Sequence, residues 1–351
     1  MDLTTQIILM VSIPFMFVVL FMPFVKKMAI QIGAVDTPGG RHIHKEVTPK
    51  LGGIAIYGGF LLGYMLFGSH SSQMNSVLIG SFIILLTGII DDITPLKPST
   101  KFIGQLLAAL VVVFYGGILL SKINAFGIKL NFGIISYPLT LFFIVGCINC
   151  LNLIDGLDGL SGGISSIYFL MVGIIATIQA KFGLDFVLAF VMLGSTLGFL
   201  IYNFYPAKIF AGDSGSNFLG FIIAVIALLG FKNVTLTSLI VPLLLIARPI
   251  LDTVFAIIRR TLKGEPISKA DNYHIHHQLL NKKLSVKQVV LIIYLVDILF
   301  AVASLIYVLG DKYLGYMVYG VLLSIVVVFV MNTNVVYEHK KKNKQIVEKN
   351  K

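Results

Sequence analysis

The stretch "NCLNLIDGLDGLSGG", residues 149–163, lies between the apolar runs "PLTLFFIVGCI" at 138–148 and "ISSIYFLMVGIIATI" at 164–178. A membrane-crossing helix needs about 20 largely apolar residues, and we read these two runs as the apolar cores of spans at 136–151 and 160–180. Two asparagines and two aspartates recur at intervals of three, which drift by about 60° per step on a helix and form no single face. Gly156 and Gly159 let the backbone leave the helix. The stretch therefore predicts a span that ends in a glycine-loosened loop.

Composition extends this interpretation to the whole chain. Of the 351 residues, 57% are apolar and only 12% are charged, and the mean hydropathy is +0.93. Soluble domains carry about 25% charged residues. The apolar runs have helical length rather than the ten-residue alternation of a β-barrel. We predict an all-α, polytopic membrane helix bundle with about 11 spans, at 5–25, 51–68, 75–90, 102–121, 136–151, 160–180, 185–203, 216–231, 234–258, 286–308 and 313–333.

Lysine and arginine predict the orientation. Most of the 27 lie in one alternating set of loops and in the tail, and this bias marks the cytoplasmic side. The N-terminus is then outside and the C-terminus cytoplasmic. The net charge of +11 is explained by these loops and needs no nucleic acid. We expect a single transmembrane catalytic domain at 1–337 and a basic cytoplasmic tail at 338–351.

Acidic residues gather on the same side. Three separate inner loops or helix ends carry Asp91, Asp92, Asp155, Asp158 and Asp213. Acids at membrane depth are costly and usually functional, so we predict a site that faces the cytoplasm. A secondary transporter is the alternative from another class, but transporters place such charges near the midplane, on broken helices.

The residue types favour phosphoryl transfer between a soluble nucleotide and a membrane lipid. Carboxylate and amide oxygens beside glycine turns suit Mg²⁺, which usually binds one or two protein oxygens together with substrate phosphates. Lys101 and a histidine cluster in the longest inner loop can neutralise the remaining phosphate charge. Zinc is conceivable for the histidines, but the acidic surroundings favour Mg²⁺.

Four motifs in order carry a resemblance to a known family. "DD" at 91–92 with "STK" at 99–101, "NLIDGLDGL" at 152–160, "GDSGS" at 212–216 and "HIHH" at 274–277 resemble the polyprenyl-phosphate N-acetylhexosamine-1-phosphate transferases, over about residues 5–333. The branch that uses UDP-GlcNAc is the more similar. The phospho-MurNAc-pentapeptide transferases of peptidoglycan synthesis are the alternative, but they typically show "PTMGG" and a triple histidine where this chain has "TPKLGG" and "HIHH".

The resemblance implies the reaction and its participants. The enzyme would transfer GlcNAc-1-phosphate from UDP-GlcNAc to undecaprenyl phosphate, releasing UMP, with Mg²⁺ as cofactor and Mn²⁺ as a substitute. It would start a cell-envelope glycan such as wall teichoic acid or O-antigen at the bacterial cytoplasmic membrane. Direct attack by the lipid phosphate is favoured over a covalent aspartyl intermediate, which the sequence leaves open.

The resemblance also implies roles for single residues. Asp91 and Asp92 would be catalytic, near the lipid phosphate or the metal. Asp213 would be the principal metal ligand with Asn152 as its partner. Substrate would be bound by Lys101, Asp155, Asp158, His274, His276 and His277, with His42 and His44 as weaker candidates.

Plainer roles compete with several of these. Asp213 suits a helix N-cap, and a helix N-terminus there would favour phosphate. Lys101 is also an ordinary positive-inside charge. Cys147 and Cys150 are expected to be packing residues. Arg248 and Asp252 are four apart on one span, where they would form a structural pair or contact the site, and Asp297 is a lone acid in a later span. Gly58, Gly59 and Gly63 permit close helix packing, in a homodimer or within the chain.

Overall fold

The computed structural model describes residues 2–37, 47–125, 128–231, 261, 279–280 and 284–331. The helices are α1 (Leu3–Gln31), α2 (Gly52–Phe67), α3 (Ser72–Ile93), α4 (Pro98–Leu110), α5 (Ser136–Ile154), α6 (Leu160–Ile178), α7 (Leu184–Asn203), α8 (Gly212–Phe231), α12 (Val286–Leu309) and α13 (Lys312–Met331). A π-helical turn, Val111–Tyr115, extends α4, and a 3₁₀ turn, Gly133–Ile135, precedes α5. The expected helix bundle is confirmed in this mostly helical fold.

Each expected span coincides with a helix, except the one at 234–258, which lies outside the described residues. Within the described ranges, 8 helical segments are long and apolar enough to cross a membrane, and α2 and the helix at Tyr313–Val328 are shorter apolar helices. The total of about 11 and the orientation of the termini stay predictions.

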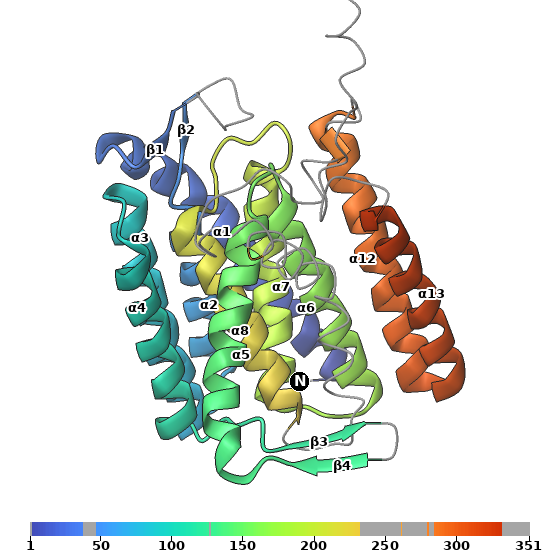
Figure 1. The fold of residues 1–351 in the computed structure, drawn as a ribbon. Helices are drawn as coiled ribbons and strands as arrows, with labels where there is room; N and C mark the ends of the chain where they lie inside the picture. Colours follow the sequence, from blue (N-terminus) through green and yellow to red (C-terminus); the bar gives the residue numbers. More distant parts are fainter. Residues whose placement is uncertain are drawn as a thin grey trace, which may run out of the picture.

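Two short antiparallel ribbons were not expected from the sequence. β1 (Val35–Asp36) pairs with β2 (Thr48–Pro49), and β3 (Lys122–Ala125) pairs with β4 (Ile128–Asn131). They lie at opposite ends of the bundle, and the N-terminus is at the end that carries β3 and β4 (Figure 1). Since each strand has at most four residues, period-2 patterning had little length in which to appear.

Local signals explain where several helices begin. Ser71 caps α3 by accepting a hydrogen bond from the Met74 amide at 3.1 Å. Ser285 and Gln288 form a capping box at the start of α12. Pro98 occupies the first position of α4, where its missing N–H costs nothing.

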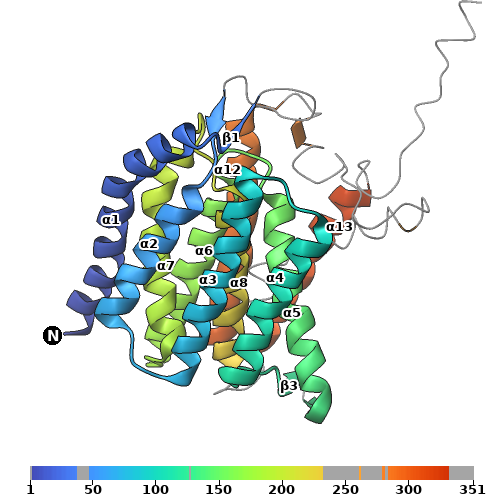
Figure 2. The same ribbon diagram turned by 90° about the vertical axis from the view of Figure 1, so that its left-hand side faces the viewer.

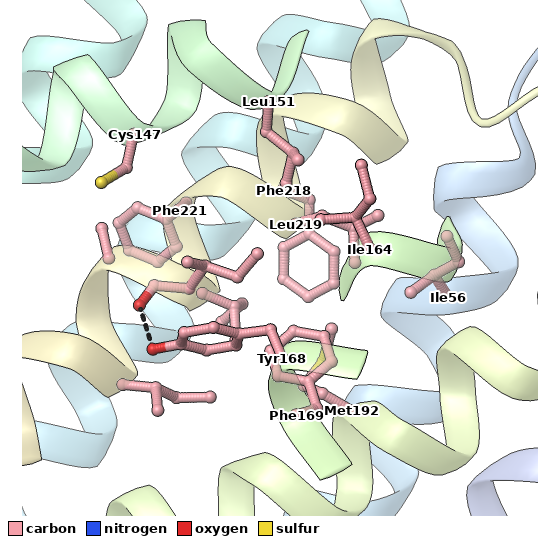
Figure 3. Packing of buried hydrophobic residues seen from close by; sticks show 14 of the residues in the cluster. Ile56, Cys147, Leu151, Ile164, Tyr168, Phe169, Met192, Phe218, Leu219 and Phe221 are labelled. Atoms are coloured by element: carbon pink, nitrogen blue, oxygen red, sulfur yellow. Dashed lines mark hydrogen bonds between the residues drawn. The ribbon is translucent and has the colours of Figure 1, made fainter. Parts of the chain in front are cut away.

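Helix α8 is the central helix of the bundle. It contacts α2, α3, α5, α6 and α7, and 89% of its span is buried. A helix that is apolar all round belongs in such a core. In Figure 3 the α8 residues Phe218, Leu219 and Phe221 pack among α5 and α6, and the Tyr168 hydroxyl donates a hydrogen bond to the Ile223 carbonyl at 3.2 Å.

Small residues let neighbouring helices approach α2. A side chain at Gly59 would meet Ser195 of α7 and Val18 of α1, and one at Gly63 would meet Val191 of α7. Gly58 faces Phe17 of α1. These glycines, which could have served a homodimer, are used for contacts within the chain.

Consecutive helices from α1 to α8 run in alternating directions. One end of the bundle carries β1 and β2. Three helices end there, namely α3, α5 and α7, and three others begin there, namely α4, α6 and α8 (Figure 1). The motifs at 91–101, 152–160 and 212–216 are thereby brought to one end of the molecule, which we call the motif end.

Candidate active site

The first turn of α8 is capped by an aspartate from another helix. Asp92, near the end of α3, accepts hydrogen bonds from the backbone N–H of Asp213 at 2.8 Å, the N–H of Ser214 at 3.0 Å and the Ser214 hydroxyl at 2.8 Å. The side chain is buried, with 7% exposure. The N–H groups at a helix start need acceptors, and Asp92 supplies one from a position 121 residues earlier in the sequence.

Glycines make this close contact between helices feasible. Gly212 has φ +72°, and a Cβ there would overlap the Asp92 carboxylate. A Cβ at Gly88 would overlap the backbone of Ser214, and one at Gly53 would overlap that of Gly215. α2 and α3 therefore approach the start of α8 backbone to backbone, and Asp92 can reach its amides.

Asp213 is left free of capping and joins a charged cluster. Lys101, in the first turns of α4, places its ammonium 2.5 Å from Asp91 Oδ2 and 2.6 Å from Asp213 Oδ2. The other oxygen of Asp91 accepts a hydrogen bond from the Leu96 amide at 2.7 Å, which closes the turn between α3 and α4. Two carboxylates thus share one ammonium at the motif end.

The α5 helix supplies the remaining contact to Asp213. The Asn152 side-chain amide donates to Asp213 Oδ1 at 3.1 Å and to the Ser216 hydroxyl at 3.0 Å. Ser216 in turn donates to the Gly212 carbonyl at 3.0 Å, one turn back in α8. Both oxygens of Asp213 are therefore oriented, one by α4 and one by α5.

The loop between α5 and α6 is tied down by its own acids. Asp155 accepts a hydrogen bond from the Ser161 hydroxyl at 2.6 Å, and Asp158 accepts one from the Ala207 amide at 2.9 Å. Asn203, at the end of α7, accepts from the Gly159 amide at 3.0 Å. These contacts join the loop to α6 and to the connection between α7 and α8.

A tyrosine from α12 completes the support of this loop. The Tyr294 hydroxyl donates to the Gly159 carbonyl at 2.5 Å. Gly159 has φ +80°, which favours glycine, and a Cβ at Gly163 would overlap the tyrosine ring. The expected glycine-loosened loop is confirmed: α5 ends at Ile154 and α6 begins at Leu160.

Known proteins resemble the chain over most of its length. A family model for glycosyl transferase family 4 matches residues 74–231. A Bacillus subtilis protein named as a probable undecaprenyl-phosphate N-acetylglucosaminyl 1-phosphate transferase is 40% identical over 82% of this chain and 81% of its own. The chain belongs to this transferase family. It is therefore an enzyme, a phosphosugar transferase of a bacterial multi-pass membrane class.

More distant relatives agree. A decaprenyl-phosphate N-acetylglucosaminephosphotransferase of Mycolicibacterium smegmatis is 34% identical over 78% of the chain and 75% of its own. An undecaprenyl-phosphate alpha-N-acetylglucosaminyl 1-phosphate transferase of Escherichia coli is 30% identical over 86% of the chain and 83% of its own. The names of these relatives share a polyprenyl phosphate and N-acetylglucosamine.

The acidic loop residue Asp155 has an unusual affinity for protons. Desolvation raises its pKa to about 7. The hydrogen bond from Ser161 lowers the pKa but does not cancel the effect of desolvation. The charges of Asp213, Asp92 and Asp158 raise it further. Asp155 is therefore partly protonated near neutral pH.

The oxygen ligands that the transferase offers could fill only some of the coordination positions of Mg²⁺, and substrate phosphates would have to complete the set. In the described ranges, no three histidine, cysteine or acidic side chains come together as a metal site. The oxygens available are those of Asp91 and Asp213, with the Asn152 amide beside them. This is the pattern of Mg²⁺ held by one or two carboxylates and completed by substrate phosphates, rather than of a closed protein cage.

The structure brings most of the predicted site residues of the transferase together but gives them different partners. Asp91, Lys101, Asn152 and Asp213 form one contact group, and Asp92 lies beneath it against the α8 amides. We expected the N-terminus of α8 to be available to phosphate. This expectation is wrong for the amides of Asp213 and Ser214, because both already donate hydrogen bonds to the Asp92 carboxylate. The predicted residues His274, His276, His277, His42, His44, Arg248 and Asp252 lie outside the described residues.

Several supporting residues of the site were not predicted. Four such residues form hydrogen bonds with a predicted residue or with its loop, namely Ser161, Asn203, Ser216 and Tyr294. The serines of "GDSGS" and "LSGG" adjoin the acids in sequence, and that adjacency was the available signal. Asn203 and Tyr294 are distant in sequence, and no local pattern marks them.

Proposed function

We propose that the protein transfers GlcNAc-1-phosphate from UDP-GlcNAc to undecaprenyl phosphate, giving undecaprenyl-diphospho-GlcNAc and UMP. The observation that carries the proposal is the shared ammonium of Lys101 between Asp91 and Asp213, at the end of a membrane bundle. The names of the relatives, which combine a polyprenyl phosphate with N-acetylglucosamine, support the choice of substrates.

In the proposed reaction an oxygen of the lipid phosphate attacks the phosphorus that bears the sugar. The bond from that phosphorus to the bridging oxygen breaks, and UMP leaves with the bond's electron pair. A lipid phosphate is a competent nucleophile at neutral pH, so no covalent enzyme intermediate is required. The enzyme's contribution is then mainly positioning and charge neutralisation.

The chain's own residues would divide this work. Lys101 is placed to contact a phosphate oxygen with its ammonium. Asp91 orients or deprotonates the lipid phosphate. Asp213 and Asn152 would hold Mg²⁺, which when bound would neutralise charge on the donor diphosphate. Asp155 and Asp158 lie on the loop that would face the nucleotide.

We further propose that the motif end faces the cytoplasm and that the product starts a cell-envelope glycan such as wall teichoic acid. The cytoplasmic assignment is supported by the lysine and arginine bias. The phospho-MurNAc-pentapeptide transferase remains the second candidate donor specificity. A transporter is disfavoured because the polar cluster lies at helix ends rather than at mid-span.

The test is turnover by purified protein in detergent. Undecaprenyl phosphate, Mg²⁺ and labelled UDP-GlcNAc should give labelled lipid and UMP, and chelation should stop the reaction until Mg²⁺ or Mn²⁺ is restored. Label transferred only from UDP-MurNAc-pentapeptide would show that the donor is wrong. Asp213→Ala should abolish turnover, whereas Asp311→Asn, an acid at the opposite end of the bundle, should leave it unchanged.

A further inference from the structure

A pair of side-chain amides joins α4 to α5 below the charged cluster. Asn149 donates to Gln105 Oε1 at 2.7 Å, and the Gln105 amide returns a longer contact to Asn149 Oδ1 at 3.5 Å. Asn149 also donates to the Val145 carbonyl at 2.8 Å. Gln105 is buried, with 5% exposure. Both hydrogens of the Asn149 amide are therefore used within the protein.

The pair lies in register with the site. Gln105 follows Lys101 by four residues on α4, and Asn149 precedes Asn152 by three on α5, so each pair of residues lies on about the same side of its helix. One turn nearer the motif end, Lys101 and Asn152 meet the two oxygens of Asp213. α4 and α5 are thus linked twice, directly by the amides and indirectly through Asp213.

The amide pair specifies geometry in a way that apolar packing does not. α4 packs against α3 and α5, and Figure 2 shows α4 and α5 at one side of the bundle, away from α1. Side-chain amides in an apolar environment are costly when unpaired, so each demands the other at hydrogen-bond distance. Apolar contacts tolerate small slides and rotations of one helix on another.

We propose that Gln105 and Asn149 are positioning residues that fix the rotation and depth of α4 against α5. They hold Lys101 between Asp91 and Asp213 while Asn152 stays on the other oxygen of Asp213. The consequence for turnover rests on the proposed function, but the effect on the Lys101 ammonium does not. Asn149 is accordingly a support for the site, with its side-chain amide bonded to Gln105 and to the Val145 carbonyl.

The experiment compares four variants: Gln105→Leu, Asn149→Leu, the double leucine variant, and the exchange Gln105→Asn with Asn149→Gln. The first readout is the acylation rate of the Lys101 amine, measured by mass spectrometry against the exposed Lys208. Each single variant and the double leucine variant should raise this rate at least about fivefold, because the ammonium is no longer held between two carboxylates. The exchange variant should restore it. Thr177→Val, which removes a hydroxyl bond to Gly173 at the far end of α6, is the control.

The second readout is turnover together with unfolding temperature. The single variants should lower kcat about 10- to 100-fold, with KM for the donor within about threefold. The double leucine variant should recover stability, since two apolar partners leave no unpaired amide, without recovering kcat. Unchanged Lys101 labelling in Gln105→Leu, or full kcat in the double leucine variant, would overturn the proposal. Altered labelling in a protein that is inactive with UDP-GlcNAc would instead refute the proposed function alone.

Discussion

Replacing Asp92 by alanine removes the acceptor that caps the central helix. The Ser214 hydroxyl can turn to the Ala211 carbonyl, which lies 3.4 Å away, but the amides of Asp213 and Ser214 lose their acceptor. An ordinary N-cap contributes about 1–2 kcal/mol, and a buried donor without a partner costs about 1–3 kcal/mol. We therefore expect Asp92→Ala to lower the free energy of unfolding by about 2–5 kcal/mol.

The assay follows from the composition. The chain contains no tryptophan. In a Cys150→Ser background, which removes the half-buried second cysteine, the remaining Cys147 is buried with 6% exposure, so a thiol-reactive dye reports the loss of packing in detergent. Midpoints should be compared at one heating rate, because unfolding of such proteins is often irreversible. Asp92→Asn keeps one carbonyl acceptor and should fall between wild type and Asp92→Ala.

Asp91→Ala is the matched comparison, since it removes the neighbouring carboxylate from the same helix end. Asp91 contacts Lys101 and the Leu96 amide rather than the amides of α8, so we expect a large loss of turnover with a smaller loss of stability. The reasoning fails if Asp92→Ala melts at the wild-type temperature while turnover disappears. Asp92 would then act in the chemistry itself.

Other substitutions test the same site. Lys101→Met should lower turnover at least about 100-fold in the labelled-lipid assay, with partial recovery in Lys101→Arg, whose planar group fits the two carboxylates differently; wild-type turnover would remove Lys101 from the mechanism. Gly212→Ala should lower the melting midpoint more than Gly33→Ala. Both glycines have positive φ, +72° and +74°, but a Cβ at Gly212 would overlap the Asp92 carboxylate, whereas the space at Gly33 is open. Equal losses would contradict the crowding at Gly212. Desolvation raises the pKa of Asp155 to about 7, above the ordinary value of about 3.9, so the folded state holds this proton more tightly. That stabilisation is complete below about pH 4 and is lost as the pH rises through about 7. Wild type should therefore lose stability relative to Asp155→Asn between pH 5 and 7 and run parallel to it above about pH 8; parallel curves throughout would contradict the raised pKa.

The spans could be predicted because apolar length is a local property of the sequence. The loop after Ile154 was also predictable, since Gly156 and Gly159 mark it locally. The different surroundings of Asp91 and Asp92 were not. Adjacent residues on a helix point about 100° apart, and here Asp91 turns to the Lys101 ammonium while Asp92 turns to the backbone amides of α8. Which one meets α8 depends on how α3 is rotated in the bundle, and the sequence does not give that rotation.

The role of Asp213 shows the same limit from the other side. An aspartate at a helix start suits an N-cap on sequence grounds. Here the cap comes from Asp92, and Asp213 is thereby available to Lys101 and Asn152. A cap supplied from another helix follows from tertiary packing, in this case through Gly53, Gly88 and Gly212, and has no signature in the local sequence.

The electrostatic balance of the site follows from this division. The carboxylates of Asp92 and Asp158 accept hydrogen bonds from backbone amides, and Asp155 shares its charge with a proton near neutral pH. The two remaining acids, Asp91 and Asp213, share the single ammonium of Lys101, so acidic groups outnumber basic ones among these three side chains. Ionised carboxylates beside the ammonium oppose the approach of a lipid phosphate and a sugar-nucleotide diphosphate. In the proposed mechanism, a divalent cation held at Asp213 and Asn152 would supply the further positive charge that phosphate binding at the motif end calls for.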